Sequence, residues 1–308
     1  MKPRDVLLLL MLSCIWGSAY LFIHVVVGEV GAFTVVAGRL TIAAIFLAPL
    51  AARRGGLLPA RGARWPVLFL AVFYNVIPFS LITIAEKSIA TGLAATLVAT
   101  MPLFTLIVAS ASGTERPGAE AVGGLLIGFA GAVVVVGPAL GDLTSSNALG
   151  DLIVVLAAAS YGLSTVVARQ TARGSAMTLA SGQTIFGAAI AVPLALAVDG
   201  VPRHGLSVEA TLSWLALGVL CSGVAFVLFY LILESASATQ ASIVSYIIPI
   251  FAALLGWAVL GESIGPNLLV GLALIVVGVA AVNGGLRPAR ERLLRVMRPA
   301  VRASREAD

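Results

Sequence analysis

The chain has 308 residues, of which 60% are hydrophobic and 11% are charged, and its mean hydropathy is +1.07. A soluble domain is about half apolar and about a quarter charged, so this composition excludes an ordinary soluble protein. The net charge of +5 would suggest nucleic-acid binding in a soluble protein, but in a chain surrounded by lipid its placement along the sequence has to be considered first.

Ten apolar segments follow one another, each close to the roughly 20 residues that a spanning helix needs. We therefore predict an all-α integral membrane protein, because the alternating segments of about 10 residues typical of a β-barrel are missing. Lys2 and Arg4 precede the first segment without a clear cleavage site, so we expect a retained helix. The segments are 6–27, 32–52, 65–85, 89–112, 121–140, 152–170, 176–198, 212–233, 239–260 and 267–283.

An internal duplication relates residues 88–137 to residues 235–284, with no gap in the alignment. Pro102 then aligns with Pro249 and Glu115 with Glu262. Such matches carry more weight than matched aliphatic residues in a chain this apolar, so we interpret them as a repeat. Four glycine pairs match as well: Gly118 and Gly265, Gly124 and Gly271, Gly131 and Gly278, Gly137 and Gly284.

The basic residues indicate the orientation of the chain, because cytoplasmic loops of membrane proteins collect Lys and Arg. With a cytoplasmic N-terminus, 16 of the 19 basic residues lie on the cytoplasmic side, and only Lys87 and Arg203 lie outside. A repeat of five helices then begins its second copy on the opposite side, which is the inverted topology of many transporters. We expect repeats at 1–140 and 149–285, followed by a basic cytoplasmic tail at 286–308.

Several of these features resemble the EamA-type drug/metabolite transporter superfamily, in its ten-helix bacterial form. They are Trp16-Gly17 in the first segment, Arg39 in the second, and the prolines of the fourth and ninth segments with the turns Thr114-Glu115 and Gly261-Glu262. The family usually has Gly where this chain has Thr114. The resemblance implies a multi-pass protein of the bacterial inner membrane that exports or exchanges small metabolites, often amino acids. It also implies a central cavity between helices 1, 3, 4, 6, 8 and 9.

Arg39 is the one charge that lies inside an apolar segment. Placing Arg near a bilayer centre costs at least about 2.5–3.5 kcal/mol, so an interaction must offset that cost. Arg39 either binds a carboxylate of the substrate or has a structural role, in which it snorkels or bonds free backbone carbonyls.

The acidic residues all lie at segment ends, in loops or in the tail, and none lies in mid-segment. A buried carboxylate is the usual proton relay of a coupled transporter, so we expect uncoupled transport or exchange rather than obligate proton antiport. No metal cluster and no set of catalytic residues is visible, so we expect no enzyme, no metal and no cofactor. His24, late in the first segment, is either a coupling residue or an ordinary polar group near the interface.

Polar and aromatic side chains deep in the segments are the candidates for lining a substrate cavity. Each of them also has a structural interpretation, because Ser and Thr bond the preceding helical turn and aromatic residues pack in cores. Aromatic faces with neutral donors and one possible Arg suit a neutral or zwitterionic metabolite. The predicted substrate-binding residues are Trp16, Tyr20, Arg39, Tyr74, Asn75, Thr100, Tyr161, Ser164, Ser245 and Tyr246.

Pro102 and Pro249 each remove a helix hydrogen bond near the middle of a segment, and we expect them to act as hinges or gates rather than passive kinks. Gly124 and Gly128 create a smooth helix face, which packs either within one chain or in a homodimer. We therefore predict a secondary transporter that works by alternating access, as a monomer or homodimer in the lipid bilayer. The alternatives are a channel-like pore, a proton-coupled antiporter, or a scaffold or receptor that transports nothing.

Overall fold

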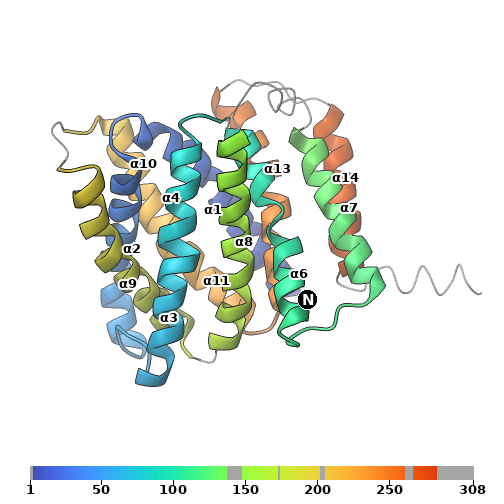
Figure 1. Cartoon of the computed structure of the whole chain (residues 1–308), viewed down its shortest axis with the longest axis horizontal. Helices are drawn as coiled ribbons and strands as arrows, with labels where there is room; N and C mark the ends of the chain where they lie inside the picture. The colour runs from blue at the N-terminus through green and yellow to red at the C-terminus, as the bar shows by residue number, and fades with distance from the viewer. Residues whose placement is uncertain are drawn as a thin grey trace, which may run out of the picture.

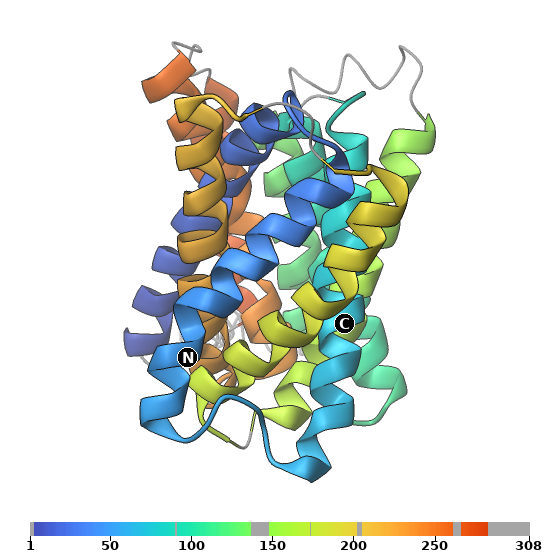
Figure 2. The same cartoon turned by 90° about the vertical axis from the view of Figure 1, so that its left-hand side faces the viewer.

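The computed structural model describes residues 3–89, 91–136, 148–172, 174–201, 205–260 and 266–282. Every regular element in these ranges is a helix, and the helices stand side by side in one bundle (Figures 1 and 2). This confirms the predicted all-helical class. The predicted tail at 286–308 and the turn at Gly261-Glu262 lie outside the described residues.

The helices fall into two series along the chain, and several apolar segments are built from two or three consecutive helices. The first series is α1 (Pro3–Val27), α2 (Ala32–Arg54), η1 (Arg61–Ala63), α3 (Arg64–Leu70), η2 (Ala71–Val76), α4 (Ile77–Ala85), α5 (Thr91–Val98), α6 (Met101–Ala111) and α7 (Ala119–Val136). The second series is α8 (Ala148–Thr171), α9 (Ala176–Val198), α10 (Val208–Gly218), η4 (Val219–Val224), α11 (Ala225–Leu233), α12 (Ala238–Ser242), α13 (Val244–Leu260) and α14 (Pro266–Val282).

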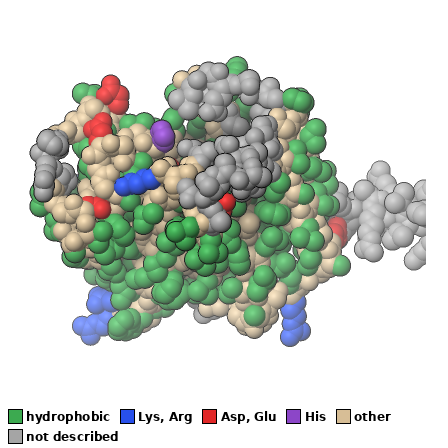
Figure 3. Space-filling view, turned by 45° about the horizontal axis from the view of Figure 1, so that its top comes forward, with side chains coloured by type: hydrophobic (Ala, Val, Ile, Leu, Met, Phe, Trp, Pro, Cys, Tyr) green, Lys and Arg blue, Asp and Glu red, His purple; other side chains and the backbone are tan. Residues whose placement is uncertain are grey.

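Eight helices, or runs of joined helices, in the described ranges are long and apolar enough to cross a membrane. They correspond to eight of the ten predicted segments. The other two segments form shorter apolar helices, Ala119–Val134 and Leu269–Val282, so a total of ten spans stays a prediction. Figure 3 shows the apolar side chains covering the sides of the bundle, with most of the charged side chains near its two ends.

Two spans contain a six-residue π-helix, η2 and η4, and each π-helix is followed by a nine-residue α-helix. A π-helix adds a residue to the helical turn, and such segments are frequent at functional sites. Pro78 lies at the start of α4, where its missing N–H already weakens the α-helical ladder. In the second span, Gly218 and Gly223 lie in and beside η4, where they let α2 approach closely.

Glycines hold α7 against α14 at backbone distance. A Cβ atom added to Gly124 would lie 2.8 Å from the carbonyl oxygen of Gly278, and one added to Gly131 would lie 2.8 Å from that of Gly271. Residue numbers rise along α7 as they fall along α14, so the two helices are antiparallel. The smooth face predicted from these glycines therefore packs within one chain.

A second matched pair of contacts involves residues in the middle of the bundle. Gly17 of α1 faces Phe251 of α13, and a Cβ atom on Gly17 would lie 2.7 Å from the Phe251 Cβ. Gly162 of α8 faces Phe104 of α6 in the same manner, at 2.6 Å. These four residues occupy equivalent places in the two series, so α1 meets α13 as α8 meets α6.

Two loop carboxylates accept hydrogen bonds from the first turns of helices. Asp199, directly after α9, accepts hydrogen bonds from the backbone N–H of Thr34 (2.7 Å) and from its hydroxyl (2.9 Å) in the first turn of α2. Glu115 accepts a hydrogen bond from the backbone N–H of Thr239 in α12 (3.2 Å). Carboxylates are favourable at helix N-termini, where the first N–H groups lack partners. Asp199 and Glu115 therefore have structural roles at these helix ends.

Candidate functional site

A cavity lies among helices of both series, with an empty volume of about 590 Å³ that includes its opening to solvent. Most of the residues around it are apolar or aromatic, and Arg39 supplies a charge. Its lining consists of Trp16, Ala19, Tyr20, Ile23, Arg39, Tyr74, Phe79, Ile82, Val98, Met101, Tyr161, Val244, Ser245 and Ile248. An apolar cavity with a few polar groups is the usual form of a small-molecule site.

Arg39 reaches this cavity from the first half of α2 and is only 3% exposed. Its Nε donates a hydrogen bond to the Ser222 hydroxyl of η4 (3.0 Å), and its guanidinium carbon lies 3.7 Å from the centre of the Phe79 ring. The aromatic face stabilises the cation, and the hydroxyl satisfies one donor. Among the described residues the guanidinium forms no other hydrogen bond and no ion pair, so its remaining donors can serve a ligand in the cavity.

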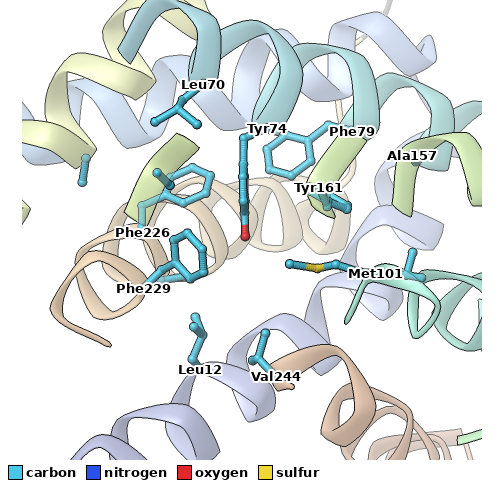
Figure 4. Packing of buried hydrophobic residues seen from close by; sticks show 14 of the residues in the cluster. Leu12, Leu70, Tyr74, Phe79, Met101, Ala157, Tyr161, Phe226, Phe229 and Val244 are labelled. Atoms are coloured by element: carbon cyan, nitrogen blue, oxygen red, sulfur yellow. The ribbon is translucent and has the colours of Figure 1, made fainter. Parts of the chain in front are cut away.

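Aromatic rings from several helices pack together beside the cavity, and Figure 4 shows Tyr74, Phe79, Tyr161, Phe226 and Phe229 of this group. The Tyr74 ring lies 5.1 Å from the rings of both Tyr161 and Phe229, and the Trp16 ring lies 5.7 Å from that of Phe229. Leu12 precedes Trp16 by one turn of α1, and Leu70 precedes Tyr74 by one turn of its own span. Both leucines are fully buried. The cavity therefore ends at the aromatic residues, in the half of the bundle nearer the α1–α2 loop.

Six of the ten predicted substrate-binding residues line this cavity: Trp16, Tyr20, Arg39, Tyr74, Tyr161 and Ser245. The indole N–H of Trp16 donates to the Cys221 carbonyl oxygen (3.1 Å), which restrains the orientation of the ring. The hydroxyl of Ser245, at the start of α13, donates to the carbonyl oxygen of Ser242 at the end of α12 (3.0 Å). The geometry brings these side chains together, and their role in binding stays a prediction.

The other four predicted residues lie outside the cavity lining. Asn75 accepts a hydrogen bond from Gln183 of α9 (2.7 Å). Thr100 bonds the Leu97 carbonyl (2.7 Å), and Ser164 is buried without a hydrogen-bond partner in the described structure. Tyr246 donates to the Leu125 carbonyl (2.8 Å) and packs in a separate apolar cluster. The hydrogen bonds of Asn75, Thr100 and Tyr246 suit structural roles, and the role of all four residues in binding stays a prediction.

The two predicted hinge prolines have different surroundings. Pro102 is the second residue of α6, directly after a break in the span at Ala99 and Thr100. Pro249 lies inside the continuous helix α13, and the break in its span comes earlier, at Ile243. His24, the predicted coupling residue, has an exposed side chain and does not line the cavity.

Glu86 corrects one inference from the sequence. Because every carboxylate lies at or near a segment end, the sequence predicts no buried carboxylate. That was wrong, since Glu86 is only 6% exposed and both of its carboxylate oxygens lack a hydrogen-bond partner in the described structure. Asp5, in the first turn of α1, is buried as well. Glu86 and Glu234 both follow long apolar segments, and the sequence carries no signal that tells which of them is buried.

Proteins with similar sequences are named as transporters. The uncharacterized inner membrane transporter YedA of Escherichia coli is 27% identical over 283 residues, covering 89% of each chain. The uncharacterized transporter YoaV of Bacillus subtilis is 26% identical over 200 residues, covering 65% of this chain and 68% of its own.

A solved crystal structure at 22% identity superposes with a TM-score of 0.78 over 94% of this chain, so it has the same fold. The EamA-like transporter family matches the sequence twice, over residues 4–137 and 148–284. Together these segments take up most of the described bundle and all fourteen cavity-lining residues. The chain therefore belongs to the EamA-like transporter family.

Proposed function

We propose that this protein is a secondary transporter for a small neutral or zwitterionic metabolite with an apolar or aromatic part, such as an amino acid. The observation that carries the proposal is the cavity, in which one buried guanidinium stands among aromatic rings. Arg39 suits a carboxylate, because a guanidinium can donate two parallel hydrogen bonds to it. Stacked and tilted rings suit the apolar part of the same ligand.

Alternating access through two inverted five-helix repeats is the mechanism that we infer. The antiparallel pairing of α7 with α14 supports it, as do the matched glycine contacts of α1 with α13 and of α8 with α6. The matched π-helices, one in each series, offer places where the spans could bend. To expose the site on the other side, the aromatic contacts between Tyr74, Phe229 and Trp16 would have to separate.

The direction of transport and the placement in the cell follow as parts of the same proposal. Ten spans, a bacterial inner membrane and cytoplasmic termini are supported by the basic residues between the second and third segments, Arg53, Arg54, Arg61 and Arg64, and by the membrane-transporter relatives. We propose export or facilitated exchange, by a monomer or a homodimer. A channel-like pore is the second candidate, since the space of the cavity includes open solvent.

Counterflow in proteoliposomes tests the proposal. We would screen amino acids, nucleobases and small amines, and then compare L-phenylalanine with phenylpropionate, which lacks the ammonium group, and phenethylamine, which lacks the carboxylate. A carrier gives saturable counterflow, whereas a pore gives flux that does not saturate and no counterflow.

Arg39→Gln should abolish the preference for ligands with a carboxylate, and Arg39→Lys should restore part of it. Arg54→Gln, which changes an exposed Arg at the end of the same helix, is the matched control. If carboxylate ligands are transported equally well by Arg39→Gln at normal expression, Arg39 does not bind the substrate.

A further inference from the structure

We propose that Glu86 is a proton-binding site beside the cavity, and that it releases its proton when a ligand carrying an ammonium group enters. This inference rests on the proposed function, because it concerns the same cavity. It adds a coupling residue and a second recognition element for the ligand, opposite in charge to Arg39.

The position of Glu86 relative to the cavity comes from its helix. Phe79 and Ile82 of α4 line the cavity, and the backbone N–H of Glu86 bonds the Ile82 carbonyl at 2.9 Å. Residues three or four apart share one face of a helix, so Glu86 lies one turn beyond Ile82 on the cavity face. Glu86 does not itself line the cavity in this conformation.

The surroundings of Glu86 favour its protonated form. Its carboxylate is buried, and neither oxygen accepts a hydrogen bond from a described residue. Burial raises the pKa of Glu86 well above its ordinary value of 4.5, and the positive charge of Arg39 lowers the pKa by a smaller amount. A buried carboxylate without hydrogen bonds is costly, and protonation removes the charge.

The other titratable groups near Glu86 include one cation that acts on its carboxyl, Arg39. Tyr20 of α1 is within electrostatic range of both Glu86 and Arg39. Tyr161 of α8 interacts electrostatically with Arg39 and Tyr20. Asp151 lies in the first turn of α8, which packs against α4. Lys87 is exposed beside Glu86. Of these groups, Arg39 is the cation that acts on the Glu86 carboxyl, and it already bonds Ser222 and faces Phe79.

The proton exchange balances as one acid–base step. The carboxylic acid of Glu86 loses its proton to water, and the resulting carboxylate pairs with the ligand's ammonium group. One proton leaves for each ammonium ligand bound. Because Arg39 and ionised Glu86 have opposite charges, a zwitterion binds with its carboxylate toward Arg39 and its ammonium group toward Glu86. A ligand that lacks an ammonium group binds without releasing a proton.

Infrared difference spectra of the full-length protein test the proton site without any ligand. We expect the carbonyl band of a protonated carboxyl at neutral pH, and we expect Glu86→Gln to remove it. Glu234→Gln is the matched control, because Glu234 directly follows α11 as Glu86 follows α4, but is exposed. If the wild type and Glu86→Gln give the same carboxyl band, Glu86 is ionised and the proposal fails.

Binding of phenethylamine as a function of pH tests the coupling. Its apparent affinity should rise by up to about tenfold per pH unit over the range in which Glu86 is protonated in the free protein. Phenylpropionate should show no such rise, and neither ligand should show it in Glu86→Gln. A slope that persists in Glu86→Gln, or that disappears in His24→Gln instead, would overturn the role of Glu86.

The two proposals fail separately in these experiments. If L-phenylalanine shows counterflow but phenethylamine does not bind at any pH, the transporter proposal stands and the ammonium role of Glu86 is wrong. If the carboxyl band belongs to Glu86 but no solute shows counterflow, the proton site stands while the transport proposal fails.

Discussion

The two spans that contain a π-helix share the order α-helix, π-helix, α-helix, but their side chains have different roles. In α3–η2–α4, the π-helix presents Tyr74 to the cavity, and Phe79 and Ile82 follow on the same span. In α10–η4–α11, the π-helix presents the small residue Ser222, which holds Arg39 at 3.0 Å. One span therefore lines the space for a ligand, and the other positions the charge that faces it. The matched π-helices determine where a side chain lies, and the residue type determines whether it lines the cavity or positions Arg39.

Packing against α2 also differs between these two spans. Gly218, the residue before η4, lies so close to α2 that a Cβ atom there would come within 2.4 Å of the Ile42 side chain. The residue before η2 is Leu70, which is fully buried in the main apolar cluster. The second span therefore touches the helix that carries Arg39 at backbone distance, and the first span fills the core with a large side chain.

The largest effect that would sharpen this comparison is expected for Phe226→Ala. Phe226 follows η4 and is fully buried, with its ring 6.0 Å from that of Tyr74. Removing a buried Phe leaves a cavity, so we expect a loss of about 3–5 kcal/mol in the free energy of unfolding.

Unfolding in mixed micelles by titration with a denaturing detergent would measure this loss. Leu215→Ala is the control, because Leu215 lies on the same span and is 46% exposed. Equal losses in the two variants would show that α10–η4–α11 does not support the core as described.

Much of the fold could be predicted from the sequence, because lipid imposes simple rules on apolar segments. The helical class follows from composition, and the approximate spans follow from segment length. The π-helices were not predicted. Only Pro78 hints at one of them, and no proline lies within α10–η4–α11 to indicate the other. Local hydrophobicity does not reveal a change in helical register.

The candidate site could be predicted only in part, for a similar reason. Trp16 and Arg39 stand out because a lone charge or a central indole in an apolar segment needs a partner. Tyr246 stands out equally, yet it bonds Leu125 in another cluster. Glu86 was missed because a segment end can be buried by neighbouring helices. Which face of a helix lines the cavity depends on tertiary packing, which the pattern of residues along a single segment does not predict.

A smaller effect is expected for Ser222→Ala, which would break the comparison at the side chain that holds Arg39. The variant removes the acceptor of the Arg39 Nε–H group, so the guanidinium should lose its fixed orientation toward the cavity. We expect the affinity for phenylpropionate to fall about tenfold, which corresponds to ~1.4 kcal/mol.

Binding of phenylpropionate to both Ser222→Ala and Ser164→Ala would check this expectation. Ser164 is the control because its buried hydroxyl has no hydrogen-bond partner in the described structure. A comparable loss of affinity in Ser164→Ala would mean that the effect comes from general packing rather than from the position of Arg39.

The smallest effect concerns the carboxylates that end the two spans, Glu86 after α4 and Glu234 after α11. The raised pKa of Glu86 means that its contribution to stability is fully present below the ordinary carboxyl pKa of 4.5. This contribution is lost as the pH rises through the higher pKa of the folded state, because the unfolded chain then ionises more readily. Glu86→Gln cannot ionise, so it should become more stable relative to the wild type as the pH rises. We expect this change to be on the order of 1 kcal/mol between about pH 4 and about pH 8.

Detergent-titration unfolding at both pH values would measure the difference for Glu86→Gln and Glu234→Gln. Glu234 is exposed, and changes at exposed sites usually alter stability by less than about 0.5 kcal/mol. Glu234→Gln should therefore follow the wild type at both pH values. If both variants show the same pH dependence, the difference in burial between the two span ends has no energetic consequence. If only Glu86→Gln departs from the wild type, burial at the end of α4 gives Glu86 the pH-dependent contribution to stability that its raised pKa requires.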